Sequence, residues 1–122
     1  MEDQFISYQT ALLAKEKGFD LNSNYFREQE EGSPDYDDSC ENWNLYDGYC
    51  TIVTQSILQK WLREKKHRNI RIGSTSLTCH FPYVEKIYED GTQMVNVVFK
   101  GNYKSYEDAL EFGIQEALKT IL

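Results

Sequence analysis

Residues 105–121 constrain the fold of this chain more than any other stretch, because they specify both a helix and the shape of its partner. Ser105 is a typical N-cap, and Asp108 stands three residues later, as in an Asp variant of the capping box. A long helix with one continuous apolar face needs a flat surface to pack on, and the nearest candidate is a hairpin around Gly91. The residues of that face recur at helical spacing and are Tyr106, Ala109, Leu110, Gly113, Ile114, Ala117, Leu118 and Ile121.

The stretch TQSILQKWLREKKHRNIRI, residues 54–72, predicts a second helix followed by a strand. Thr51 or Thr54 supplies the N-cap. The closing letters NIRI predict a strand that turns Ile70 and Ile72 to the same side. The apolar residues of the helix recur at the 3.6-residue period and form one tight stripe of Ile57, Leu58, Trp61 and Leu62.

A first helix is predicted between Ser7, its N-cap, and Gly18, the residue after its end. Two aromatic segments follow, NYFRE and NWNLY, and we predict that they pair as a hairpin because aromatic side chains favour a pleated, half-buried surface. The acidic connector between them, residues 28–42, is predicted to be a mobile loop. The short stripe of the first helix consists of Tyr8, Ala11, Leu12 and Lys15.

Residues 76–99 predict a second pair of strands. The runs SLTCHFPYVEKIY and QMVNVVF flank EDGT, in which Asp90 and Gly91 suit a two-residue type I′ turn. Pro82 is expected at an edge, a bulge or a strand break, because proline donates no backbone hydrogen bond. The element order is therefore helix, hairpin, helix, meander and helix. That order is typical of an α+β fold with three helices packed against a small antiparallel sheet.

Length and composition predict one globular domain over residues 1–122, with 40% hydrophobic and 14% aromatic residues. No run of 18 apolar residues occurs, and the acidic N-terminus lacks the apolar segment of a signal peptide. The three cysteines are an odd number, which is typical of reduced thiols. We therefore expect a cytoplasmic protein with no membrane partner. Its core is predicted to contain Leu12, Ile57, Trp61, Leu62, Ile70, Leu110, Ile114 and Leu118.

Four segments are similar to those of a group of small proteins encoded by phages and prophages of gut bacteria. They are SYQTALLAKEKGFD, NYF, TQSILQKWLREKKHRNIRI and SYEDALEFGIQEALKTIL, of which the central QKWLRE run is the most specific. The chain departs from the pattern at Val53, where the group has proline, and in an acidic insert near residues 28–42. The resemblance implies a phage-type accessory protein and implies no particular activity.

Charge is unevenly distributed along the chain. The formal net charge is −7, but residues 1–50 carry −9 and residues 51–71 carry +5. A basic cluster can contact nucleic-acid phosphates, yet it is also what the solvated back of a core helix carries. We further predict that this patch meets the acidic half of the chain, within one molecule or between two copies. The candidate interaction patch consists of Lys60, Arg63, Lys66, Arg68 and Arg71.

No set of residues predicts catalysis, a cofactor or a bound metal. Three cysteines with His80 could supply four zinc ligands, but ten residues separate Cys40 from Cys50. Cys79 and His80 are adjacent, so in a strand they point to opposite faces, which also opposes a Cys-His nucleophile pair. Neither a phosphate-binding loop nor a nucleophile elbow occurs. We therefore expect the chain not to be an enzyme.

The sequence favours a non-catalytic accessory protein that acts by binding another protein or a second copy of itself. The alternative is a nucleic-acid-binding accessory protein that uses the basic face of the helix at residues 54–68. The overall negative charge disfavours this alternative, because it repels a polyanion at long range.

Overall fold

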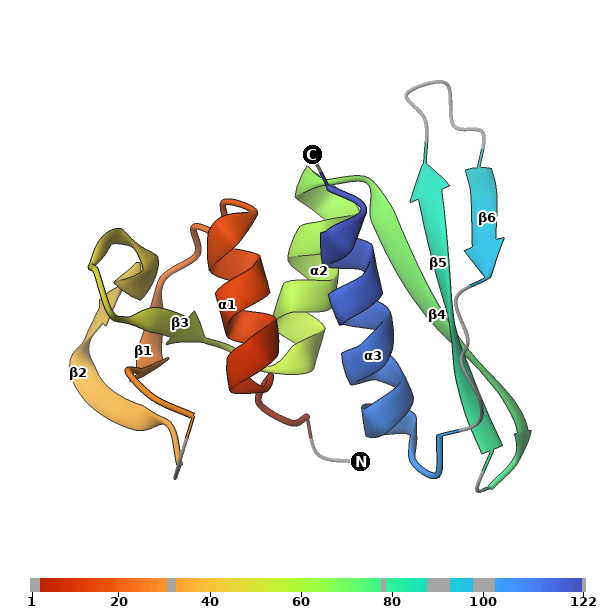
Figure 1. The fold of residues 1–122 in the computed structure, drawn as a ribbon, viewed down its shortest axis with the longest axis horizontal. Coiled ribbons are helices and arrows are strands. Elements are labelled where there is room, and N and C mark those ends of the chain that lie inside the picture. Colours follow the sequence, from red (N-terminus) through yellow and green to blue (C-terminus); the bar gives the residue numbers. More distant parts are fainter. Residues whose placement is uncertain (1–2, 31–32, 78, 88–92, 98–102, 122) are drawn as a thin grey trace.

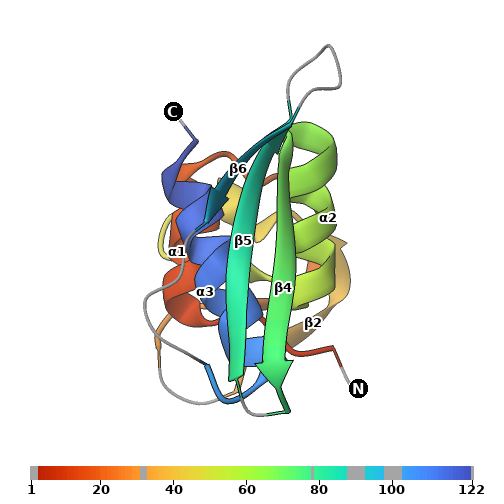
Figure 2. The same cartoon turned by 90° about the vertical axis from the view of Figure 1, so that its right-hand side faces the viewer.

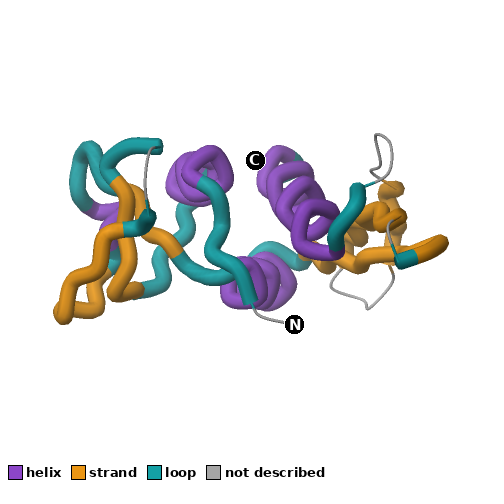
Figure 3. The backbone as a smooth tube through the Cα atoms, turned by 90° about the horizontal axis from the view of Figure 1, so that it is seen from below, coloured by secondary structure: helices purple, strands orange, loops and turns teal. Residues whose placement is uncertain are grey.

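The computed structural model describes residues 3–30, 33–77, 79–87, 93–97 and 103–121. Within these residues, three helices lie between two antiparallel sheets, so the molecule has three layers (Figures 1 and 3). The predicted α+β class and its three helices are confirmed, and a second sheet adds to the one expected. The helices are α1 (Tyr8–Glu16), α2 (Gln55–Lys65) and α3 (Tyr106–Lys119).

The first sheet has the strand order β2-β1-β3, with bounds β1 Ser23–Arg27, β2 Asp35–Glu41 and β3 Cys50–Ile52. The predicted hairpin between NYFRE and NWNLY is therefore wrong, and residues 28–42, expected as a loop, contain β2. NWNLY instead forms a 3₁₀ helix, η1 (Trp43–Leu45). The Trp43 indole N–H donates to the backbone oxygen of Ser23 at 2.7 Å, and its ring stacks on Phe26, so this segment packs over the sheet.

The second sheet is the predicted meander, in the order β4-β5-β6. Its strands are β4 (Arg68–Ser76), β5 (Cys79–Ile87) and β6 (Gln93–Val97). The predicted turn at Asp90 and Gly91 lies outside the described residues.

Pro82 lies inside the continuous central strand β5, so the expected edge, bulge or strand break is wrong. Pro82 pairs with Ile72 of β4. Hydrogen-bonded and non-hydrogen-bonded pairs alternate along an antiparallel ladder, and Ile87 N–H donates to His67 O, so the Ile72–Pro82 pair is a non-hydrogen-bonded one. The described pairing with β6 begins only at Tyr83. The missing N–H of Pro82 therefore removes no backbone hydrogen bond between the described strands.

Most of the predicted core is confirmed, but Leu12 and Ile57 are 44% and 43% exposed, so these two predictions are wrong. Helix α1 turns the smaller Thr10, Ala11 and Ala14 inward, and Leu12 lies on its other side. Ile57 falls one position off the buried stripe of α2. The confirmed core residues are Trp61, Leu62, Ile70, Leu110, Ile114 and Leu118, each at most 4% exposed.

One carboxylate on α3 joins all three helices. Glu111 accepts hydrogen bonds from the backbone N–H of Ser7 at 3.0 Å and from Gln55 Nε2 at 2.9 Å, and also from the Thr10 hydroxyl. Because Ser7 is the N-cap of α1, the negative charge also lies at the positive end of that helix. These bonds fix the helical layer that presents the outward face of α2.

Candidate interaction surface

Among the five predicted patch residues, Lys60 and Arg63 are the two that present exposed cations on α2. They are three residues apart and therefore neighbours on the helix surface. No ion pair between described residues involves either of them. Lys66, at the C-terminal cap, instead places its Nζ 5.5 Å from the centroid of the Trp61 ring, in a cation–π contact.

Arg68 ties together the C-terminal ends of two helices. Its Nη1 donates to Lys66 O at 2.8 Å, at the end of α2. Its Nε and Nη2 donate to the hydroxyl and carbonyl oxygens of Thr120, the C-cap of α3. A cation complements the negative end of a helix dipole, so this side chain has a structural role.

Arg71 lies on the face of the second sheet turned away from the helices. Its guanidinium pairs with the carboxylate of Glu85, whose side chain is only 4% exposed, and lies 5.7 Å from the Tyr83 ring. A buried carboxylate requires such a partner, which accounts for Arg71. The structure therefore divides the predicted patch among a helix face, two helix ends and a sheet.

An exposed apolar surface lies across α2 and the first sheet, apart from the predicted patch. The rings of Phe5 and Tyr25 are 4.8 Å apart, and those of Tyr25 and Tyr36 are 5.3 Å apart. Phe5, Leu21, Tyr36 and Ile57 are 41%, 37%, 60% and 43% exposed. Contiguous exposed apolar groups mark interaction sites in many proteins. We call Phe5, Leu21, Tyr25, Tyr36 and Ile57 the Ile57 surface.

Two hollows meet at Ile57 and make this surface continuous. The first, of about 250 Å³, lies between Phe5, Tyr25 and Ile57 and reaches Cys40 of β2. The second, of about 300 Å³, is lined by Leu21, Ile57, Lys60, Trp61, Glu64 and Lys65. Ile57 thus stands between an apolar hollow beside the acidic strand and a hollow with a basic rim.

Strand β2 carries four exposed or half-exposed acids and no cation: Asp35, Asp37, Asp38 and Glu41. The Asn24 side chain donates to the backbone oxygens of Asp37 and Asp38, where the register with β1 is irregular. The backbone N–H and the hydroxyl of Ser39 both donate to the Asp37 carboxylate. These two hydrogen bonds, chiefly the one from the backbone, hold the pKa of that carboxyl below its usual value. The Ser39 hydroxyl also donates to Glu41, which accepts from the Tyr46 hydroxyl at 2.7 Å, so the carboxylates of Asp37 and Glu41 lie on the face of the first sheet that carries η1.

Among the described residues, no ion pair joins the basic patch to the acidic half of the chain within one molecule. The two ion pairs among the described residues are Arg71–Glu85 and Lys119–Glu116, and neither includes an acid from residues 3–50. In Figure 1, β2 lies at the end of the molecule farthest from β4, the strand that carries Arg71.

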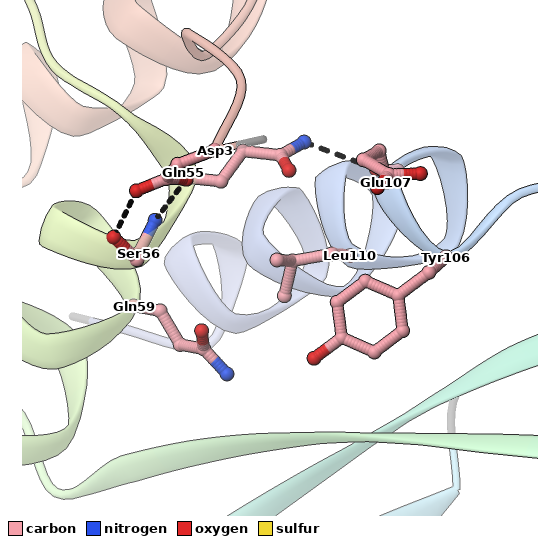
Figure 4. A pocket seen from close by; sticks show the side chains of 7 residues that line it. All are labelled: Asp3, Gln55, Ser56, Gln59, Tyr106, Glu107 and Leu110. Atoms are coloured by element: carbon pink, nitrogen blue, oxygen red, sulfur yellow. Dashed lines mark hydrogen bonds between the residues drawn. The ribbon is translucent and has the colours of Figure 1, made fainter. Parts of the chain in front are cut away.

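A third hollow, of about 250 Å³, lies between α2 and α3 (Figure 4). Asp3 accepts hydrogen bonds there from the backbone N–H of Ser56, at 3.2 Å, and from its hydroxyl, and so caps α2 from outside the helix. Partial burial pushes the pKa of Asp3 upward, but hydrogen bonds from Ser56 and Thr54 outweigh it and lower the pKa. Gln55 donates to Glu107 O at 3.0 Å. These polar groups are thus occupied by contacts that hold the helices.

The three cysteines are dispersed: Cys40 is exposed, Cys50 is buried and Cys79 is half-buried. Burial raises the pKa of the Cys50 thiol. The His80 ring contacts the Ser74 hydroxyl at 2.7 Å and Leu77 O at 3.0 Å. Across the described residues, no group of three or more His, Cys, Asp or Glu side chains is arranged to hold a metal ion.

Comparison of the chain with protein-family profiles, curated proteins and solved structures gave no match. No helix in the described part of the chain is both long and apolar enough to cross a membrane. The sequence predicts Ile57 in the core and does not mark Phe5, Leu21 or Tyr36 as site residues. The one local signal for this surface is Tyr36, a large aromatic residue within the acidic run DYDD.

Proposed function

We propose that this chain is a non-catalytic protein-interaction module that binds its partner through the Ile57 surface. The observation that carries the proposal is the continuity of that surface, in which two hollows share one exposed isoleucine. The hollows are at or below the lower limit of the roughly 300–1,000 Å³ of small-molecule sites. An apolar centre with a charged rim is instead the anatomy of a protein interface.

The resemblance to phage and prophage proteins supports an accessory role in such a genome, and the free thiols suit the reducing cytoplasm. The polar groups around the Figure 4 hollow support the non-catalytic assignment, because Asp3 and Gln55 already serve helix contacts.

A photoreactive amino acid placed at position 57 in the host cell tests the proposal. Leu12 is the matched control, because it is equally exposed but lies on α1. We expect a polypeptide adduct of discrete mass at position 57 and none at position 12, and Leu21→Asp should abolish the adduct. Equal labelling at both positions, or none at position 57, would refute the proposal.

A nucleic-acid-binding role is the second candidate, and it is supported by Lys60 and Arg63, which are exposed and adjacent on α2. Electrophoretic titration with random-sequence duplex and single strands at low salt tests it. This role requires binding that weakens steeply with salt and disappears in the Lys60→Glu, Arg63→Glu variant. We expect no such binding.

A further inference from the structure

We propose that the face of the first sheet that carries η1 binds an arginine-bearing segment of a protein partner. The guanidinium of that arginine stacks on the Tyr46 ring and pairs with the carboxylates beside it. This site goes beyond the proposed function, because it is separate from the Ile57 surface, whose aromatic residue Tyr25 lies on the opposite face of the sheet.

Aromatic rings cover this face of the first sheet. Phe26 follows Tyr25 in β1 and therefore points to the other face, where its ring stacks on Trp43 with the centroids 4.3 Å apart. The centroids of the Trp43 and Tyr46 rings are 6.0 Å apart. Asp35 of β2 pairs with Phe26 across the strands, so its carboxylate belongs to the same face. Figure 2 shows the second sheet nearest the viewer, the helices behind it and β2 at the back, so the first sheet forms the opposite end of the molecule.

Two further carboxylates are held at fixed positions beside the Tyr46 ring. Glu41 accepts a hydrogen bond from the Tyr46 hydroxyl at 2.7 Å. The Ser39 hydroxyl lies 2.8 Å from both the Asp37 and the Glu41 carboxylate oxygens and links them. The negative charge at this face therefore has a defined arrangement around one aromatic ring.

No described cation forms an ion pair with these carboxylates. Arg27 of β1 points to the opposite face, because side chains alternate along a strand, and its Nη1 donates to Glu30 O at 2.8 Å. Lys15 approaches from α1, but its Nζ donates to the backbone oxygens of Tyr46 and Tyr49 at 3.0 Å and 2.7 Å. The charge of this face thus requires a complementary cation from a partner.

The aromatic ring favours arginine over lysine as that cation. Tyr46 is 45% exposed, and its neighbour Leu45 is 79% exposed, so both are open to a partner side chain. A guanidinium stacks on an aromatic ring and donates two parallel hydrogen bonds to a carboxylate, whereas an ammonium is a strongly hydrated point charge. We call Asp35, Asp37, Glu41, Leu45 and Tyr46 the η1 surface.

Capped hexa-arginine and hexa-lysine peptides, titrated by calorimetry at low salt, test this inference. The site variant is Asp35→Asn with Glu41→Gln, in which glutamine can still accept the hydrogen bond from Tyr46. The matched control is Glu64→Gln with Asp108→Asn, which changes the net charge equally but lies on α2 and α3. All four side chains are exposed or half-exposed, so each variant should keep the native circular dichroism spectrum.

Hexa-arginine should bind the site variant at least about threefold more weakly than the native chain, because two exposed ion pairs are lost, whereas the control should differ by less than about twofold. The native chain should bind hexa-arginine about twofold to fivefold more tightly than hexa-lysine, as expected for stacking at an exposed ring. Tyr46→Leu should remove this preference while hexa-lysine binding persists. All binding should weaken as salt rises and shortens the screening length.

Backbone NMR locates the bound peptide. Hexa-arginine should shift the amide signals of Glu41 and Tyr46 and leave that of Ile57 unchanged. Equal weakening in the site variant and the control would mean attraction to net charge alone, and it overturns the inference. Absence of binding, equal affinity for the two peptides, or shifts centred elsewhere also overturns it. None of these results affects the adduct at position 57, which tests the proposed function separately.

Discussion

Replacing Gly113 by alanine should destabilise this protein, although the same change stabilises most helices. Gly113 lies within α3 where the helix crosses the second sheet. A Cβ atom built at this position would lie 2.9 Å from Ile70 Cγ2 and 2.9 Å from Pro82 Cβ. Both neighbours are buried and stiff, because one is β-branched and the other is a ring in the central strand.

The net effect is the difference between two opposing terms. Alanine in a helix interior gains about 1 kcal/mol over glycine. Overpacking a tight core costs about 1–3 kcal/mol, and the upper half of that range applies where the neighbours cannot turn away. We therefore expect Gly113→Ala to lower the free energy of unfolding by about 1–2 kcal/mol.

Urea unfolding followed by tryptophan fluorescence measures this change, with the slope checked to confirm that the transition stays two-state. Combining Gly113→Ala with Ile70→Ala should cost less than the two single changes together, because removing Ile70 Cγ2 relieves one of the two clashes. If Gly113→Ala instead raises stability by about 1 kcal/mol, the helix propensity term is unopposed, and the close packing of α3 on the sheet is refuted.

Three further predictions follow from burial and charge. Trp61→Ala should lower the free energy of unfolding by about 3–5 kcal/mol, and a change under about 0.5 kcal/mol would place Trp61 outside the core. Burial raises the pKa of Cys50, so the free energy of unfolding should fall as pH rises above about 8.5, where the thiol ionises in the unfolded chain. Mass spectrometry should find that a thiol reagent labels Cys40 in the native protein but labels Cys50 only after denaturation. The hydrogen bonds that lower the pKa of Asp3 stabilise the fold at pH values above the ordinary pKa of 3.8, and this stabilisation is lost as the pH falls through the lowered pKa. Asp3→Asn should therefore reduce the dependence of the free energy of unfolding on pH in the acidic range, and an unchanged dependence would exclude this contribution.

The elements that the sequence predicted correctly are those with a strong internal period. Helix α3 has its cap and its apolar stripe in one continuous run, and α2 buries Leu58, Trp61 and Leu62 at helical spacing. Strand β2 had no such signal, because an exposed edge strand with acidic side chains on both faces shows no alternation. Trp43 suggested a strand but is held over the sheet by a hydrogen bond to Ser23 and by the Phe26 ring, contacts that only the tertiary fold creates.

The candidate site was less accessible to sequence reasoning than the fold. Arg68 and Arg71 follow Lys60 and Arg63 closely in the chain, but the helix ends at Lys65 and the strand carries them elsewhere. Phe5, Leu21 and Ile57 come from separate segments and meet only when α2 packs beside the first sheet. Nothing in local spacing relates them, so their common surface is a result of the tertiary structure.

The most direct measurement of the central claim is whether the Ile57 surface is covered in the cell. In a Cys40→Ser background, Ile57→Cys and Leu12→Cys each place one thiol at positions of nearly equal exposure on different faces. Alkylation rates are compared between living cells and dilute purified protein, with nuclease treatment as a further arm. We predict that position 57 reacts several-fold more slowly in cells whereas position 12 does not, and that nuclease leaves this protection intact. Equal rates at position 57 in cells and in dilute solution, or protection that nuclease removes, would contradict a protein partner on this surface.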